Sequence, residues 1–221
     1  MQLFKRFTSH TIRLREQTNK RLEAYIHPTL SFFLLITLST AIVVLGLLLN
    51  NTAIVIGGMV VAPLITPIFG FSLGLILLKI KRIFSSLMAI FLGGTLAVLV
   101  SAIISKLIII MEGQNFTLTN EIIARAEPNL LFFLVALFSG VAGAYAYTNK
   151  NVAEHITGIA ISVAIIPPLA VMGVGLTIFN WNLFEQSFFL FLLNLAGITF
   201  GSVITFVSMG FGRDIEVTAK E

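Results

Sequence analysis

The stretch NTAIVIGGMVVAPLITPIFGFSLGLILLK, residues 51–79, is long and apolar enough to cross a membrane, yet two prolines lie near its centre. Pro63 and Pro67 are four residues apart, and Gly70 and Gly74 follow them. Proline removes one backbone donor and disfavours helical torsions in the residue before it. The sequence therefore predicts a membrane span that breaks near mid-depth.

The composition places most of this chain in lipid. Of its 221 residues 57% are hydrophobic and only 11% are charged, more apolar surface than a soluble domain of this length can bury. Six apolar stretches each reach the ~17–25 residues that a helix needs to cross the hydrocarbon layer. They are residues 29–49, 53–78, 83–111, 129–147, 155–179 and 187–211. We therefore expect an all-α integral membrane protein with six transmembrane helices.

The basic residues predict how these helices are oriented. If the N-terminus is cytoplasmic, twelve of the 14 Lys and Arg residues lie inside and only Lys106 and Arg125 lie outside. We expect a multi-pass protein of the prokaryotic inner membrane with both termini in the cytoplasm. The net charge of +4 reflects this asymmetry, so no nucleic acid partner is expected.

Three regions follow from this topology. Residues 1–27 are predicted to form a cytoplasmic, basic amphipathic segment on the membrane surface, or alternatively a frayed tail that only orients the protein. Residues 28–212 form the six-helix transmembrane domain, and residues 213–221 form a cytoplasmic tail.

The two halves of the chain resemble each other. At an offset of 100 residues Pro28, Ser39 and Asn51 fall on Pro128, Ser139 and Asn151. At an offset of 105 Pro63 and Gly70 fall on Pro168 and Gly175. A repeat of three spans places its second copy upside down, so we predict a 3+3 inverted repeat with proline-broken helices 2 and 5.

Paired interrupted helices at mid-depth indicate a solute site in inverted-repeat transporters. The carbonyls of Met59, Pro63, Val163 and Ala164 are expected to lose their helical partners, and Thr66 and Ser162 add hydroxyl groups. The predicted binding residues are Met59, Pro63, Thr66, Pro67, Ser162, Val163, Ala164, Pro167 and Pro168. Carbonyls favour a cation and helix N-termini favour an anion, so the charge of the solute stays open. The alternative is a pair of proline kinks that neighbouring helices satisfy without any ligand.

A second set of polar residues is predicted to gate or support this site: Asn51, Arg125, Glu127, Asn129 and Asn194. Glu121 and Arg125 are spaced i, i+4, so a short interfacial helix with an ion pair is the alternative explanation for the segment around Arg125. For Asn194 the alternative is an interhelical hydrogen bond that only fixes packing.

Residues that would indicate an enzyme are missing. No Asp or Glu lies in the central part of a span, and His10, His27 and His155 are far apart in the sequence. We therefore expect no catalytic residues, no metal site and no cofactor.

Four segments resemble a known prokaryotic family: NNTAIVIGGMVVAPLITPIFG, ARAEPNLLFFLVALFSGVAGAYA, AISVAIIPPLAVMGVGL and NLAGI. The chain is similar, over roughly residues 30 to 210, to the domain of unknown function 389 family of integral membrane proteins. The resemblance implies a membrane fold and leaves the activity open. It singles out Asn51, Gly57, Pro63, Pro67, Arg125, Pro128, Asn129, Pro168 and Asn194.

Two functions remain from these patterns. The first is a membrane transporter or channel for a small solute or ion, with a midplane site formed by broken helices 2 and 5. The alternative is a membrane scaffold or regulatory subunit that binds partner proteins through Gly-rich helix faces, such as Gly70/Gly74 and Gly197/Gly201. The expected partners are the lipid bilayer and a small solute or ion, and the small-residue faces are also compatible with a homo-oligomer.

Overall fold

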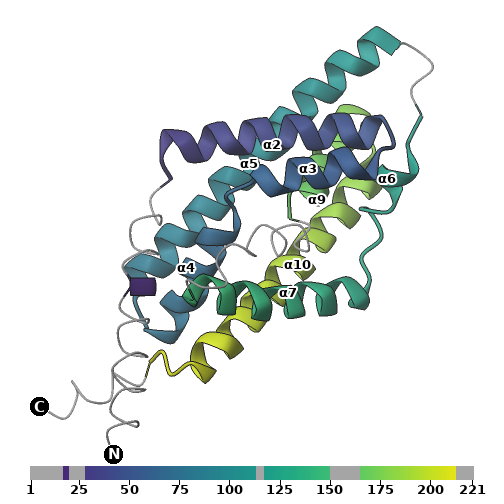
Figure 1. Cartoon of the computed structure of the whole chain (residues 1–221). Coiled ribbons are helices and arrows are strands. Elements are labelled where there is room, and N and C mark those ends of the chain that lie inside the picture. Colours follow the sequence, from purple (N-terminus) through teal and green to yellow (C-terminus); the bar gives the residue numbers. More distant parts are fainter. Residues whose placement is uncertain (1–16, 20–27, 113–116, 150–164, 213–221) are drawn as a thin grey trace, which may run out of the picture.

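The computed structural model describes residues 17–19, 28–112, 117–149 and 165–212, and every regular element in these ranges is a helix. The longer helices are α2 (Leu30–Leu48), α3 (Thr52–Val61), α4 (Ile65–Ile76), α5 (Ile80–Glu112), α7 (Leu130–Thr148), α9 (Ile166–Thr177) and α10 (Trp181–Ser208), and α6 (Asn120–Ile123) is a single turn. Figure 1 shows α5 and α10 crossing the bundle obliquely, with α2 and α3 on one side and α7 on the other.

Four of these helices, α2, α5, α7 and α10, are long and apolar enough to cross a membrane, and α3 with α4 makes a fifth span if the bent pair is counted as one. They are compatible with a multi-pass membrane protein. The expected fifth span, residues 155–179, is described only from residue 165 onward, as α9. The predicted N-terminal segment, apart from residues 17–19, and the predicted tail from residue 213 lie outside the described residues.

A tight turn joins α2 to α3. Asn50 has a φ of 51°, a left-handed conformation that Asn tolerates better than most residues. The side chain of Asn51 then caps α3 by accepting the N–H of Ile54 at 3.2 Å. Farther along the pair, the Ser39 hydroxyl donates to the Gly58 carbonyl at 2.7 Å, which binds the two antiparallel helices together.

Glycines let α7 and α10 approach at backbone distance. A Cβ atom built on Gly140 would lie 2.4 Å from the carbonyl oxygen of Ile198, and one on Gly201 would lie 2.1 Å from that of Leu137. Any side chain at either position would collide with main-chain atoms that cannot rotate away. The small-residue pattern of these two helices is therefore used inside the chain.

Hydroxyl groups form further contacts between helices. Ser72 of α4 and Ser202 of α10 are hydrogen-bonded at 2.7 Å, and both side chains are fully buried. Ser101 of α5 donates to the Ala170 carbonyl of α9 at 2.5 Å. The first bond holds the short helix α4 against the long helix α10, and the second holds the short helix α9 against the long helix α5.

The first helices of the two halves have matching dimensions. α2 and α7 each contain 19 residues and begin 100 positions apart. Their buried positions match at the same offset: Ile36, Ser39, Thr40, Val43, Val44 and Gly46 in α2 correspond to Ala136, Ser139, Gly140, Gly143, Ala144 and Ala146 in α7. In Figure 1 the two helices run in opposite directions.

The later helices match at an offset of 101. α4 and α9 each contain 12 residues, and each is followed two positions later by a left-handed residue, Leu78 with φ 52° and Phe179 with φ 54°. Ser101 and Ser202, which bond to the short helix of the opposite half, are also 101 positions apart. Figure 1 shows α5 and α10 running in opposite directions, as α2 and α7 do.

Candidate functional site

The apolar stretch around Pro63 folds as two helices. α3 ends at Val61, α4 begins at Ile65, and their axes are bent by 54°. Ala62, which precedes the proline, has a ψ of 125°, the extended conformation that a following proline ring favours. The chain therefore changes direction at Pro63 without a glycine.

The other prolines begin helices. Pro67 lies in the first turn of α4, and Pro167 and Pro168 lie in the first turn of α9. The N–H groups of a first helical turn have no acceptor within the helix, so proline there costs no helical hydrogen bond. In a buried position it also removes a donor that would otherwise need a partner. Of the four prolines, only Pro63 lies between two described helices.

Some of the expected free backbone groups differ in the structure. The carbonyl of Met59 has no i+4 donor, because residue 63 is proline, but it accepts the N–H of Ala62 at 3.3 Å instead. The reason is that α3 closes with one tighter turn before the proline. Ser162, Val163 and Ala164 of the predicted site lie outside the described residues.

The starts of α4 and α9 both lie against the middle of α5. A Cβ atom on Gly93 would be 3.1 Å from Cδ2 of Leu64, the residue before α4. A Cβ atom on the next residue, Gly94, would be 3.6 Å from Cδ2 of Leu169, in the first turns of α9. The two short helices therefore begin beside the same pair of glycines.

From this point α4 and α9 run apart. Gly74, near the end of α4, lies against Ile83 at the beginning of α5. Gly173 of α9 lies against Ser101, well toward the other end of α5. The N-termini of the two helices thus point toward each other, and their C-termini point away. We call the region where they begin the helix-start junction, which comprises residues 64–67 and 166–169 around Gly93 and Gly94.

The junction is buried, and its two helix starts each contribute positive polarity. Leu64, Ile166 and Leu169 are at most 3% exposed, and neither helix start has a side-chain cap. Each helix N-terminus carries roughly half a positive charge, because its first N–H groups point outward from the helix. Once the prolines are discounted, the first-turn donors include the N–H groups of Ile65, Thr66 and Ile166. Such an arrangement attracts acceptor atoms and negative charge.

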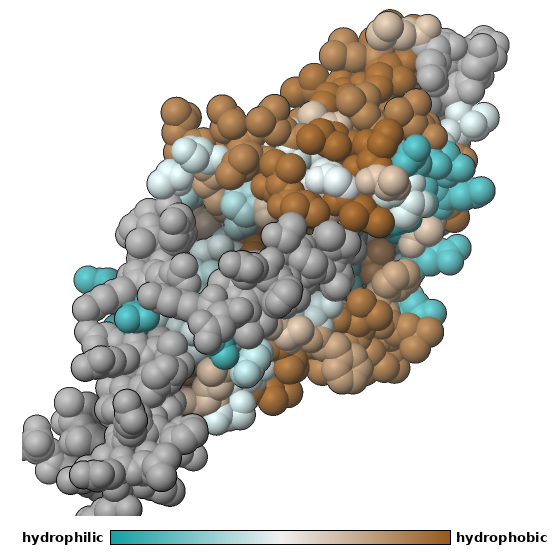
Figure 2. Space-filling model, in the orientation of Figure 1, coloured by the Kyte–Doolittle hydropathy of each residue, from teal (hydrophilic) through white to brown (hydrophobic). Residues whose placement is uncertain are grey.

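A polar cluster lies at one end of the bundle, where α6 meets the α2–α3 turn. The Arg125 guanidinium pairs with the Glu121 carboxylate at 2.6 Å, and Thr52 Oγ1 donates to the same carboxylate at 2.5 Å. Asn50 Oδ1 accepts the N–H of Glu121 at 3.1 Å, and Thr119 Oγ1 donates to a carbonyl of α2 at 2.6 Å. Hydrophilic residues gather at this end of the molecule in Figure 2.

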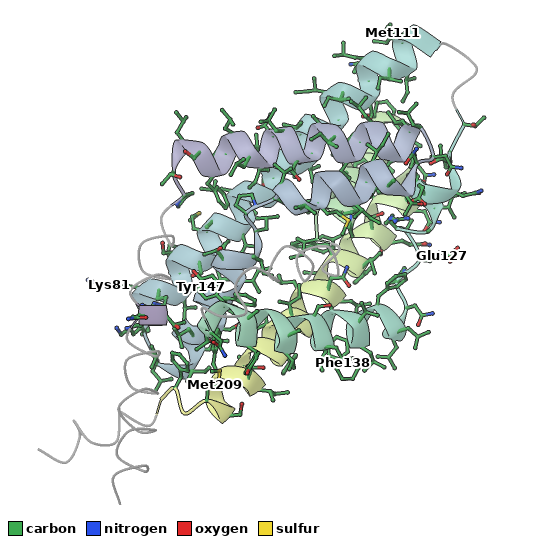
Figure 3. The ribbon with its side chains drawn as sticks, viewed as in Figure 1. Lys81, Met111, Glu127, Phe138, Tyr147 and Met209 are labelled. Atoms are coloured by element: carbon green, nitrogen blue, oxygen red, sulfur yellow. The ribbon has the colours of Figure 1, made fainter. Side chains whose placement is uncertain are left out.

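The predicted gate residues take different roles. Asn51 and Asn129 cap α3 and α7 through their side chains, and Arg125 belongs to the polar cluster. Glu127 is exposed at the same end of the bundle, opposite the end that carries Lys81, Tyr147 and Met209 (Figure 3).

Asn194 is different, because it is only 3% exposed within α10. The structure thus brings Asn51 and Arg125 to one end and leaves Asn194 inside the bundle.

Sequence reasoning did not select the buried serines Ser72, Ser101 and Ser202, nor Thr52 in the polar cluster. Ser101 lies two turns after Gly94 on the same face of α5, a spacing visible in the sequence, whereas Ser72 and Ser202 have no such relation to the glycines of their helices. The role of Thr52 had no such signal, because it depends on α6 folding back onto the α2–α3 turn.

The described helices, with their length and apolar composition, are compatible with a multi-pass α-helical membrane protein. More specifically, residues 59–200 match the family described as Domain of unknown function (DUF389), and the chain belongs to this family. It is 28% identical over 184 residues to the uncharacterized protein MJ0678 of Methanocaldococcus jannaschii, a match that covers 80% of this chain and 53% of that protein. The chain therefore spans about half the length of this curated relative. No solved structure matches the chain.

Proposed function

We propose that the protein is a membrane transporter or channel for a small solute or ion, and that its substrate binds at the helix-start junction. The observation that carries this proposal is the placement of two uncapped helix N-termini against Gly93 and Gly94 in the buried middle of α5. Discontinuous helices of this kind bind substrates in transporters because their N-termini supply donors at membrane depth. Met59, Pro63, Thr66, Pro67, Pro167 and Pro168 are the described residues that we assign to the site, with Ser162, Val163 and Ala164 completing it.

We further propose that the chain is a 3+3 inverted repeat of six spans. Three observations support this: the paired lengths of α2 and α7, the paired lengths of α4 and α9, and the opposite directions of the corresponding helices in Figure 1. In this arrangement residues 150–164 and α9 together form the fifth span, as α3 and α4 form the second. The junction then lies on the axis that relates the two halves.

The polarity of the junction favours an anion or the acceptor-rich end of a polar solute. Helix N-termini present N–H groups, and the Met59 carbonyl, which could have served a cation, is already hydrogen-bonded. A cation would need carbonyl oxygens as ligands. The carbonyl groups in the first turns of these two helices point away from the site. We propose no catalytic activity and no cofactor for this site.

The protein is proposed to lie in the prokaryotic inner membrane with both termini in the cytoplasm. The separation of Lys81 from Glu127 along the bundle supports this orientation (Figure 3). The cluster of Arg125, Glu121 and Thr52 then lies at the outer surface, where we assign it the role of an entrance gate with Asn51, Glu127 and Asn129 around it. Asn194 supports the site from α10.

The alternative function, a scaffold that binds partners through Gly-rich faces, has less support. Gly140, Gly197 and Gly201 are occupied by contacts between α7 and α10, and Gly74 by the contact between α4 and α5. Among the glycines with described surroundings, Gly57 alone has nothing within 4 Å of a built Cβ atom.

Solute-evoked currents and radiolabelled uptake in proteoliposomes test the transport proposal, with panels of small anions, cations and neutral metabolites. The test variant is Thr66→Val, which removes the hydroxyl at the junction while keeping the side-chain shape. The control is Thr37→Val, because the Thr37 hydroxyl only donates to the Phe33 carbonyl on α2.

We expect flux of one solute class, with anions favoured. Thr66→Val should raise the half-saturation concentration about three- to tenfold, the effect of one lost hydrogen bond, and Thr37→Val should not. Absence of flux across the panels from correctly inserted protein would contradict transport. Flux that both variants leave unchanged would keep transport and contradict the proposed site.

A further inference from the structure

A groove runs along the surface between α2 and α5. One part, with a volume of about 520 Å³, is lined by Pro28, Ile80, Lys81, Phe84, Ser85 and Met88. A second part, of about 600 Å³, is lined by α2 residues between Leu30 and Leu38 and by Leu92 and Leu96 of α5. The two parts follow one another along α5, because Phe84 and Met88 line the first, Leu92 and Leu96 line the second, and these residues are spaced four apart.

The groove is apolar along its length and basic at one end. In the second part of the groove the one polar side chain is Thr37, and its hydroxyl already donates to the Phe33 carbonyl at 2.9 Å. Lys81 lies at the other end and is exposed, and the structure records no ion pair for it within the described residues. Figure 3 places Lys81 at the opposite end of the bundle from Met111 and Glu127.

The dimensions fit one lipid in one leaflet. Along α5 the groove extends from Lys81 to Leu96, a rise of roughly 22 Å, and the part from Lys81 to Leu92 covers roughly 16 Å of it. One leaflet of hydrocarbon is about half of the ~30 Å core. Large apolar side chains along the groove stay open to the surroundings, with Phe84 63% and Leu34 55% exposed. A groove of this length with a cation at the interfacial end therefore suits an acyl chain attached to a negatively charged headgroup.

We propose that the groove between α2 and α5 is a binding site for an anionic phospholipid. The headgroup phosphate contacts the Lys81 ammonium beside Ser85, and one acyl chain lies against Phe84, Met88 and Leu92. This site is distinct from the helix-start junction, because its lining does not include Gly93, Gly94, Leu64 or Leu169. Binding here would hold α2 and α5 together at the membrane surface without taking part in transport.

Photocrosslinking of the full-length protein tests this assignment directly. A photoreactive diazirine amino acid replaces Met88, and the protein is reconstituted in vesicles that contain equal amounts of phosphatidylglycerol and phosphatidylcholine with identical acyl chains. We expect the adduct mass to be mainly that of phosphatidylglycerol. Equal labelling by both lipids, or an adduct with the protein's own terminal segments or with a second copy, would overturn the proposal.

Affinity measurements separate the headgroup contact from general charge. Native mass spectrometry of the detergent-purified protein, titrated with phosphatidylglycerol, compares Lys81→Gln with Lys106→Gln, the same change at an exposed position near the other end of α5. Lys81→Gln removes one interfacial charge and should weaken phosphatidylglycerol binding about fivefold. Lys106→Gln should leave the affinity unchanged. Equal affinity of the two variants would overturn the role of Lys81.

The acyl-chain contact has its own matched pair. Leu92→Trp fills the groove, whereas Leu107→Trp adds the same bulk on an exposed part of α5 outside it. We expect the crosslinking yield of phosphatidylglycerol to fall only for Leu92→Trp. An unchanged yield would show that the lipid does not lie in the groove.

Discussion

Gly201→Ala provides a sharp test of how α7 and α10 pack. The added Cβ would lie 2.1 Å from the Leu137 carbonyl oxygen and 2.8 Å from the Val141 nitrogen, whereas real Cβ contacts essentially never fall below 3.0 Å. Since both neighbours are main-chain atoms, the helices must separate by about 1 Å at this point. Overpacking of this kind costs about 1–3 kcal/mol, against a gain of only about 0.5–1 kcal/mol from replacing a helical glycine by alanine.

We therefore expect Gly201→Ala to lower the free energy of unfolding by about 1–2 kcal/mol. The control is Gly57→Ala, which makes the same change in a helix where nothing lies within 4 Å of the new methyl group. Unfolding in mixed detergent and SDS micelles, followed by circular dichroism, gives both values. If Gly201→Ala is as stable as Gly57→Ala, the close approach of α7 and α10 at this glycine is wrong.

Three further predictions concern hydrogen bonds. In a double-mutant cycle of Ser72→Ala and Ser202→Ala, the coupling free energy should be about 0.6 kcal/mol. The value is small because each serine can also bond within its own helix, and zero coupling would contradict the contact. Thr52→Val removes a hydrogen bond to the carboxylate on α6, so amide exchange in residues 117–126 should become faster, measured by mass spectrometry, and unchanged exchange would contradict the role of the polar cluster. Pro67→Ala adds a donor to a buried helix start, and it should destabilise the protein by about 1–3 kcal/mol more than Pro128→Ala, which makes the same change at an exposed position. The same SDS unfolding measures both variants, and equal effects would argue against burial of the junction.

Part of the geometry around the site is local. The change of direction at Pro63 depends on that proline and its immediate neighbours, and so do the caps at Asn51 and Asn129, which the sequence analysis did not predict. Pro67 lies in the first turn of α4, and the sequence does not show this by itself, because a proline suits a first turn but breaks a helix interior and the difference depends on where the helix begins.

The sequence comparison used an offset of 105, which aligns Pro63 with Pro168. The helices α4 and α9 begin 101 positions apart, and that offset aligns Pro67 with Pro168 and Gly74 with Gly175. The matching buried positions, such as Ser101 and Ser202, become visible only when the packed face of each helix is known.

The sequence by itself determined that this chain is helical, strongly apolar and interrupted at Pro63, because hydropathy and backbone torsions are properties of short segments. Only the tertiary structure decided that the starts of α4 and α9 lie beside Gly93 and Gly94, that Thr52 reaches the carboxylate of Glu121, and that a groove leads from Lys81 along α5. These contacts join residues from separate helices. Their geometry depends on how closely the helices pack, and no single segment carries that information.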